Sequence, residues 1–218
     1  MTGGPLTVLT GVNRPSAPSS GGMVLVGDLY RVMPETRTVF LGREPVDPTW
    51  TTAFNRLITL STVKRPLGPD FDAYVEELTR EVRALIEEIR PDAIHAQYPG
   101  LALSLALTRA AGRIPLVSLV HGPDVMAAER SPEERARLEE AAAASAAIVV
   151  PTTALPDRID RLTSRRFTSR LTVIPWGIPV GDTRLRTRPP TGPGPCPWYT
   201  QADSTTTSPR SPRSRPSL

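Results

Sequence analysis

Short apolar runs alternate with helical patterns along most of this chain, and this alternation limits the fold more than any other feature. Apolar runs bounded by glycine, proline or polar residues predict buried strands at 93–96, 114–120, 147–150 and 171–174. Such strands, joined through helices, form a parallel sheet that is covered by helices on both faces. Because the crossover connections are right-handed, the sequence predicts a Rossmann-like, doubly wound α/β fold.

The strongest helical pattern covers residues 71–89, where eight apolar residues recur at spacings of three and four. This period predicts an amphipathic helix of about five turns with its charged residues outside. Ser131, Pro132 and Glu134 form a helix-start signal, because serine caps the helix and proline fits its first turn. The other expected elements are strands at 6–11, 37–41 and 56–60, and helices from Met23 to Met33 and at 101–111, 132–144 and 154–162.

Charge is unevenly distributed along the chain. The 218 residues carry a formal net charge of +4, but residues 183–218 contain six arginines and one aspartate, so the remainder carries −1. This last segment also has eight prolines and no apolar periodicity, as is typical of disorder. The nearly neutral body argues against nucleic acid as a partner. We expect one folded domain over residues 1–182 and a disordered Pro/Ser/Thr/Arg-rich tail over 183–218.

The sequence contains no signal for a membrane or for secretion. It lacks a run of about 18 apolar residues that could span a bilayer, and its N-terminus does not have the basic and apolar regions of a signal peptide. Cys196 is the only cysteine, so an internal disulfide is excluded, and with two histidines it does not make a metal cluster. We expect a soluble cytoplasmic protein without a metal ion or a membrane span.

Candidate ligand-binding residues follow the predicted strands, at the edge where doubly wound sheets bind ligands. Gly21 and Gly22 precede a predicted helix, and their backbone N–H groups with the helix N-terminus suit a phosphate. The only two histidines, His95 and His121, lie at the ends of predicted strands. The pKa range of an imidazole suits contact between His121 and a developing charge or a hydroxyl.

Four segments resemble glycosyltransferase family 4 in their order and spacing. They are IRPDAIHAQYPG, with a strand ending in histidine; IPLVSLVHGPD, with a strand ending in His-Gly-x-Asp; AAIVVPTTAL, with a proline turn; and LTVIPWGIP, which leads to Pro-x-Gly. The loop PSSGG also resembles the first-strand loop of that family. The resemblance covers residues 1–182. It implies the N-terminal, acceptor-side domain of a GT-B fold, in which two Rossmann-like domains face each other across a cleft.

The resemblance also implies an activity. Family 4 enzymes are retaining glycosyltransferases, so we expect a hexosyltransferase that moves a sugar from a nucleotide-sugar donor, expected to be a UDP-sugar, to a small hydroxylated acceptor without a further cofactor. The resemblance further points to the subgroup that glycosylates 2-deoxystreptamine-type aminocyclitols in antibiotic biosynthesis. By the resemblance, Gly21 and Gly22 meet the donor diphosphate, and His121 lines the site near the transferred sugar as the candidate catalytic residue.

Each candidate residue also has a structural alternative. The two glycines could form only a flexible turn, and His121 could be a packing residue. Asp124 is expected either to bind an acceptor hydroxyl or amine, or to cap the following turn. His95 is a candidate for the acceptor side, but strand-end histidines often have a packing role. Asn13, in the first loop, is expected to face the acceptor.

The tail begins where the family's second, donor-binding domain is expected to begin. That domain opens with a strand ending in Gly-Arg-Leu and a lysine a few residues later. Codons for residues 196–208, read one base out of frame, can encode V-H-A-G-R-L-D-D-H-K, which contains this motif. We therefore interpret the tail as the product of a frameshift within 182–195. The chain would then lack its donor-binding domain and would be weakly active or inactive alone.

Two other hypotheses about the function stay open. A non-catalytic module, or an inactive remnant of an enzyme, would bind the acceptor without turnover. A sugar epimerase on the same two-domain fold would be distinguished by its products.

Overall fold

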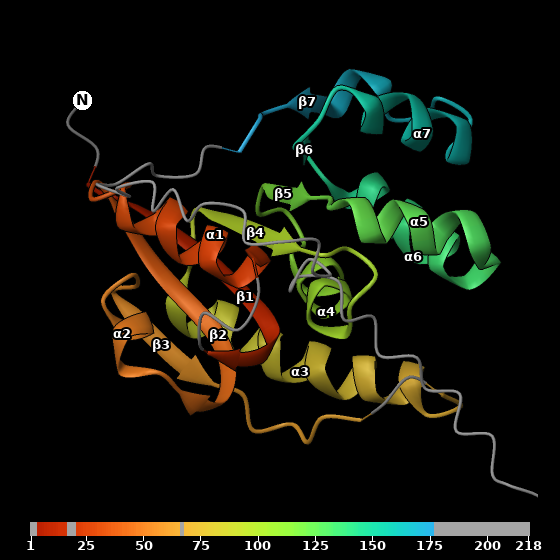
Figure 1. Ribbon diagram of the computed structural model, residues 1–218. Helices are drawn as coiled ribbons and strands as arrows, with labels where there is room; N and C mark the ends of the chain where they lie inside the picture. Colours follow the sequence, from red (N-terminus) through yellow and green to blue (C-terminus); the bar gives the residue numbers. More distant parts are fainter. Residues whose placement is uncertain (1–3, 17–20, 66–67, 177–218) are drawn as a thin grey trace, which may run out of the picture. The chain divides into compact units, whose positions relative to one another are not determined.

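A computed structural model describes residues 4–16, 21–65 and 68–176 of the chain. They belong to one compact unit, residues 1–178. Seven parallel strands form a single sheet in the order β3-β2-β1-β4-β5-β6-β7 (Figure 1). The predicted Rossmann-like α/β fold is confirmed. The strands are β1 (Leu6–Ser16), β2 (Thr36–Val46), β3 (Arg56–Thr59), β4 (Ala93–Gln97), β5 (Leu116–Leu119), β6 (Ala147–Val150) and β7 (Leu171–Val173).

The helices follow the sequence prediction closely where the apolar period is clear. The bounds predicted for α3, α6 and α7 are confirmed, but α2, α5 and the 3-10 helix η1 were not predicted. The helices are α1 (Gly21–Arg31), α2 (Pro48–Thr51), α3 (Phe71–Ile89), α4 (Ala102–Ala110), α5 (Gly122–Arg130), α6 (Pro132–Ala144), α7 (Ala154–Leu162) and η1 (Thr168–Arg170).

Local signals explain several of these boundaries. The Ser131 hydroxyl accepts a hydrogen bond from the backbone N–H of Glu134 at 3.2 Å, which confirms the predicted cap of α6. Gly112, just after α4, has a φ of +58°, in the left-handed region that glycine tolerates. β1 is longer than predicted because it continues beside β2 through register shifts at Gly11 and Pro15.

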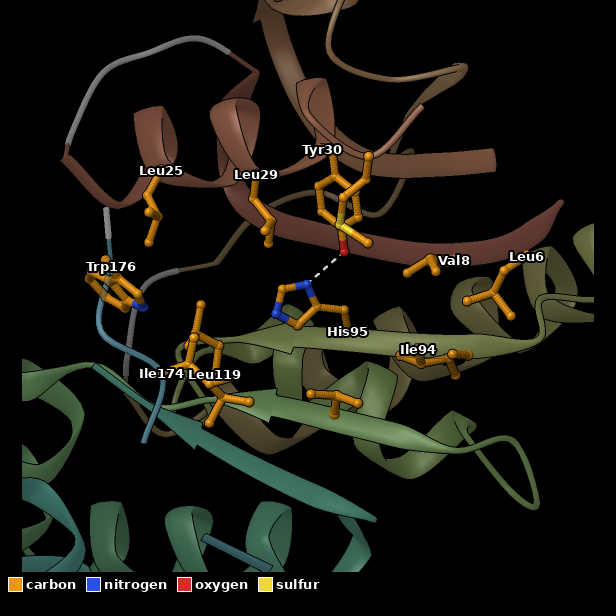
Figure 2. A pocket seen from close by; sticks show the side chains of 14 residues that line it. Leu6, Val8, Leu25, Leu29, Tyr30, Ile94, His95, Leu119, Ile174 and Trp176 are labelled. Atoms are coloured by element: carbon orange, nitrogen blue, oxygen red, sulfur yellow. Dashed lines mark hydrogen bonds between the residues drawn. The ribbon is translucent and has the colours of Figure 1, made fainter. Parts of the chain in front are cut away.

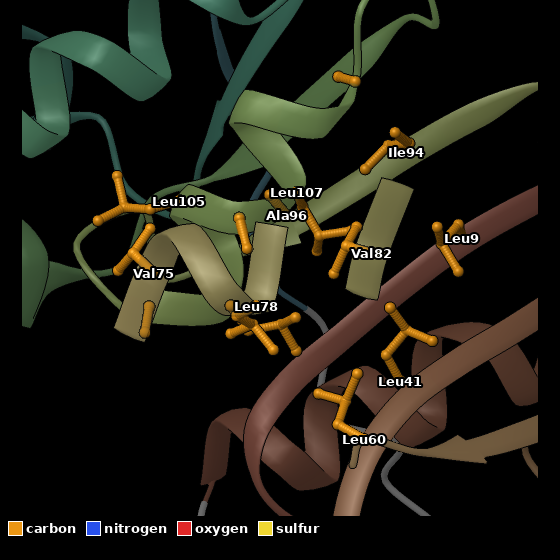
Figure 3. Packing of buried hydrophobic residues seen from close by; sticks show 14 of the residues in the cluster. Leu9, Leu41, Leu60, Val75, Leu78, Val82, Ile94, Ala96, Leu105 and Leu107 are labelled. Carbon is orange, nitrogen blue, oxygen red and sulfur yellow. The ribbon is translucent and has the colours of Figure 1, made fainter. Parts of the chain in front are cut away.

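Successive strand residues point to opposite faces of the sheet, so each strand contributes to two different environments. One face, which we call the closed face, carries Leu9, Leu41 and Ile94. They pack with α3 and α4 in a core of fully or nearly fully buried side chains (Figure 3). The opposite face, which we call the α1 face, carries Val8 and Phe40, which pack with α1 and the aromatic residues around α2.

Within the described residues, no helix is both long enough and apolar enough to cross a membrane. The predicted tail, residues 183–218, lies outside the described residues, as does Cys196.

Candidate functional site

The strand order reverses between β1 and β4, because the chain proceeds outward to β3 on one side and to β7 on the other. Doubly wound sheets bind ligands at this point, outside the carboxyl ends of the strands. Gly22 lies in the first turn of α1, which follows β1 along the chain, and Tyr98 follows β4. His121 comes two residues after the end of β5, the neighbour of β4. The fold therefore brings Gly22 and His121 to one edge of the sheet.

His121 caps the N-terminus of α5 and is only 3% exposed. Its side chain accepts a hydrogen bond from the backbone N–H of Asp124. In return, Oδ2 of Asp124 accepts a hydrogen bond from the backbone N–H of His121 at 2.8 Å. This reciprocal pair is a capping box, which satisfies backbone donors at the start of a helix. The structure therefore shows Asp124 in one of its two expected roles, that of capping the segment that follows His121.

Tyr98 lies between Gly22 and His121. Its ring is stacked on the His121 ring, with centroids 3.8 Å apart and planes inclined by 7°. Its φ is +55°, a left-handed conformation that is unusual for a bulky residue. A Cβ atom added to Gly22 would lie 1.8 Å from the Tyr98 hydroxyl oxygen, so only glycine fits there without moving the tyrosine. The two predicted sites are thus connected by a residue that the sequence prediction did not include.

A line of polar side chains continues from His121 into the sheet. Nε2 of His121 is 3.3 Å from Oε1 of Gln97, which is fully buried. Nε2 of Gln97 is 3.5 Å from Nε2 of His95, and Nδ1 of His95 is 2.6 Å from the Tyr30 hydroxyl on α1. Both histidines therefore belong to one network that extends from the carboxyl edge of the sheet to α1.

Burial determines the protonation states in this network. It lowers the pKa of His95 to about 4. It also lowers the pKa of His121 to about 4, with a smaller effect from the charge of His95. The pKa of Asp124 is raised to about 7 by burial and by the charge of Glu134, against the opposing hydrogen bond from the His121 N–H. Both imidazoles are therefore neutral at neutral pH, and neither is poised as a general acid.

An apolar pocket of about 360 Å³ lies on the α1 face of the sheet (Figure 2). The Tyr30 hydroxyl and His95 meet at its wall, while Leu25 and Leu29 of α1 point towards the strands. Trp176, also in the pocket lining, contacts the His121 ring edge-on, with centroids 4.7 Å apart. The lining comprises Leu6, Val8, Leu25, Leu29, Tyr30, Met33, Ala93, Ile94, His95, Val117, Leu119, Val149, Ile174 and Trp176.

The remaining predicted residues are more dispersed. Gly21 begins α1 and is exposed, with open space where a Cβ would lie. His95 was expected at the end of its strand, but it is the third of five residues in β4 and contacts Tyr30. Asn13 lies in β1, and its side chain is outside the described part of the structure. In the described residues, no group of three or more His, Cys, Asp or Glu side chains could hold a metal ion.

Gln97 and Tyr98 are the site residues that sequence reasoning missed. A signal for Gln97 was present, because a strand has a period of two and residue 97 shares a face with His95. The position of Tyr98 had no comparable signal, since its stack on His121 depends on the left-handed backbone at the end of β4.

Comparisons with known proteins agree with this fold. The model of Glycosyltransferase Family 4 matches residues 35–181. A similar solved structure is sucrose-phosphate synthase from Thermosynechococcus elongatus, with a TM-score of 0.59 and 15% identity over 79% of this chain and 48% of that chain. Another is UDP-GlcNAc 2-epimerase from Neisseria meningitidis bound to UDP-GlcNAc, with a TM-score of 0.55 and 14% identity over 77% and 45% of the two chains.

A third similar structure is an Anabaena protein in complex with UDP and glucose, with a TM-score of 0.54 and 15% identity over 79% of this chain and 45% of that chain. At such identities the likeness shows the fold alone. This chain spans less than half the length of each of these three structures. No curated protein sequence matches it significantly.

Proposed function

Since this chain belongs to glycosyltransferase family 4, we propose that it forms the N-terminal, acceptor-side half of a retaining glycosyltransferase. The enzyme would move a sugar from a nucleotide-sugar donor, of the UDP-sugar type, to a small hydroxylated acceptor. The observation that carries the proposal is the meeting of Gly22 and His121 at the switch point of the sheet. Two of the structural neighbours contain UDP or a UDP-sugar, which supports the choice of donor.

In this proposal the backbone N–H groups of Gly21 and Gly22 face the donor diphosphate at the N-terminus of α1. Glycine suits that position because the absence of a side chain lets an anion approach the backbone closely. The positive end of the α1 dipole adds attraction for the phosphate.

His121 is the proposed contact to the transferred sugar. Its hydrogen bond to Gln97 is long, at 3.3 Å, and a sugar hydroxyl could replace the amide oxygen as its partner. Because burial lowers the pKa of His121 to about 4, the imidazole is a weak base at neutral pH, and the proposed role is hydrogen bonding to the ligand and not transfer of a proton.

The proposed acceptor is an aminocyclitol of the 2-deoxystreptamine type. The Asp124 carboxylate, whose pKa lies near neutrality, could receive an ammonium group of such an acceptor while it caps α5. His95 and Asn13 stay as secondary candidates for the acceptor side. Both ring nitrogens of His95 already have partners within the protein, Gln97 and Tyr30.

The donor-binding half is proposed to be encoded beyond a frameshift within 182–195. The chain's coverage of less than half of its structural neighbours supports this part. Resequencing the gene from the codon for Trp176 onwards tests it. A single-base change that restores Gly-Arg-Leu, a lysine and a second Rossmann-like domain is expected. An uninterrupted frame without such a domain would favour the non-catalytic acceptor-binding module.

The activity itself is tested with the protein from the restored frame. UDP-sugars and an aminocyclitol should yield a glycosylated product, with the anomeric configuration of the donor retained. The similarity of fold to UDP-GlcNAc 2-epimerase makes epimerisation the second candidate. Conversion of UDP-GlcNAc to its C2 epimer without an acceptor would identify that reaction instead.

A further inference from the structure

Two consecutive residues at the end of β4 contact the His121 ring from two directions. We propose that Gln97 and Tyr98 are positioning residues that fix, respectively, the tautomer and the plane of the His121 imidazole. This inference rests on the proposed function, because it concerns the residue that would meet the sugar.

The tautomer follows from the hydrogen-bond partners of the ring. A neutral imidazole has one donor nitrogen and one acceptor nitrogen. The His121 side chain accepts from the backbone N–H of Asp124, and Nε2 faces Oε1 of Gln97, which can only accept. The proton therefore lies on Nε2, and Nδ1 accepts.

The orientation of the Gln97 amide is fixed by its other end. With its oxygen towards His121, the amide N–H of Gln97 is directed at Nε2 of His95. His95 then carries its proton on Nδ1, which is 2.6 Å from the Tyr30 hydroxyl. The reverse arrangement, with the amide rotated and both tautomers exchanged, would satisfy the same contacts along this buried line, but it would place an Nδ1–H of His121 against the backbone N–H of Asp124.

The plane of the ring is fixed by Tyr98. The two rings are nearly parallel at 3.8 Å, and Trp176 meets His121 edge-on. At its far end, the Tyr98 hydroxyl lies against Gly22, so Tyr98 cannot shift towards α1. The Nε2–H of His121 is thereby held towards Oε1 of Gln97, and a ligand hydroxyl that replaces this oxygen would receive the same hydrogen bond.

Histidine side-chain NMR tests the proposal on the full 218-residue chain, which has only two histidines. Long-range ¹⁵N–¹H spectra of the ligand-free wild type should show a single Nε2–H tautomer for His121. Gln97→Met, which removes the amide without a large change in volume, leaves only the Asp124 N–H to favour this tautomer and should give a detectable fraction of the Nδ1–H form. Tyr98→Leu should shift the carbon-bound ring protons of His121 downfield, because the ring current of the stacked tyrosine is lost. Tyr98→Phe, which retains the stack, should leave them nearly unchanged.

Tyr30→Phe is the matched control, because it removes a hydroxyl from the same network at His95 and should perturb the His95 resonances while His121 keeps its tautomer. An Nδ1–H tautomer in the wild type would overturn the proposal, and so would a single unchanged tautomer in a folded Gln97→Met variant. Equal ring-proton shifts in wild type and Tyr98→Leu would overturn the role of Tyr98. If Gln97→Met does not fold, the tautomer of His121 in the wild type and the comparison of Tyr98→Leu with Tyr98→Phe still test the proposal. All these spectra are recorded without ligand, so a separate failure to respond to UDP would count against the proposed function alone.

Discussion

The two faces of the sheet are built from alternate residues of the same strands, yet they differ in what covers them. The closed face packs against α3 and α4, and the side chains there, such as Leu9 and Leu41 on the sheet and Leu103 on α4, are completely buried. The α1 face contains an apolar pocket, with partly exposed Leu29 and Ile174 in its lining, and the polar line through His95. The difference indicates that the closed face supplies stability, while the α1 face and the adjoining carboxyl edge hold the groups that we propose to contact the ligands.

The largest expected effect comes from a cavity in the closed face. Leu103→Ala removes a fully buried side chain from α4, and such truncations cost about 2–5 kcal/mol of unfolding free energy. The matched change on the α1 face, Leu29→Ala, acts on a residue that is 37% exposed and should cost less than about 1 kcal/mol. Urea unfolding of both variants measures the difference. Equal losses would mean that the two faces do not differ in their contribution to stability.

The next effect concerns the approach of Tyr98 to α1. Gly22→Ala places a methyl group against the Tyr98 hydroxyl, and displacing the tyrosine from His121 should cost about 1–2 kcal/mol. Gly21→Ala is the control, since nothing lies within 4 Å of the added methyl. We expect Gly21→Ala to be neutral or slightly stabilising in the same assay. A Gly22→Ala variant as stable as Gly21→Ala would show that Tyr98 is not held between Gly22 and His121.

The third effect is a pH dependence at the carboxyl edge. The folded protein holds the Asp124 proton up to a pKa of about 7, far above the ordinary 3.8, so stability decreases as pH rises between these values. The lowered pKa values of His95 and His121 act in the opposite direction, because their stability contribution is present above about pH 6.5 and lost towards pH 4.

Asp124→Asn separates these contributions. The two histidines contribute equally to the unfolding free energy of variant and wild type, so the difference between the two proteins reports Asp124 alone. Relative to wild type, the variant should gain about 2.5 kcal/mol in unfolding free energy between pH 5 and pH 8. Asparagine retains an oxygen that can accept the His121 N–H. Urea titrations across this range measure the difference, and a constant offset at every pH would contradict the raised pKa of Asp124.

The smallest effect tests the free volume of the pocket. Val117→Leu adds a methylene to the pocket lining and should change stability by at most about 0.5 kcal/mol. Ala106→Leu enlarges a fully buried residue of the closed face, where overpacking costs about 1–3 kcal/mol. Thermal or urea unfolding compares them. A large cost for Val117→Leu would indicate that the pocket is as tightly packed as the closed face.

The sequence predicted those parts of the molecule that depend on local periodicity. The apolar repeat of α3 and the Ser131–Pro132 start of α6 determine their own boundaries, so these helices were predicted correctly. Helix α5 was missed because Gly122 and Pro123 read as a turn, whereas proline is accommodated in its first turn and His121 caps it.

The candidate site was predictable only in part for the same reason. The strand-to-loop transitions located Gly22 and His121 correctly, because each follows a recognisable strand. Their connection through Tyr98, and that of His95 to His121 through Gln97, depends on contacts between neighbouring strands and on the left-handed Tyr98. Periodicity along one segment does not contain that information.

The central claim is that the ligand-related groups lie at the carboxyl edge around Gly22, Tyr98 and His121, and not on the closed face. Titration of the ¹⁵N-labelled 218-residue chain with UDP-glucose, followed by backbone amide shifts, tests it most directly. We predict progressive shifts for the amides of Gly21, Gly22, Tyr98, His121 and Gly122, with those of α3 and α4 unchanged. Shifts confined to other parts of the chain would contradict the claim.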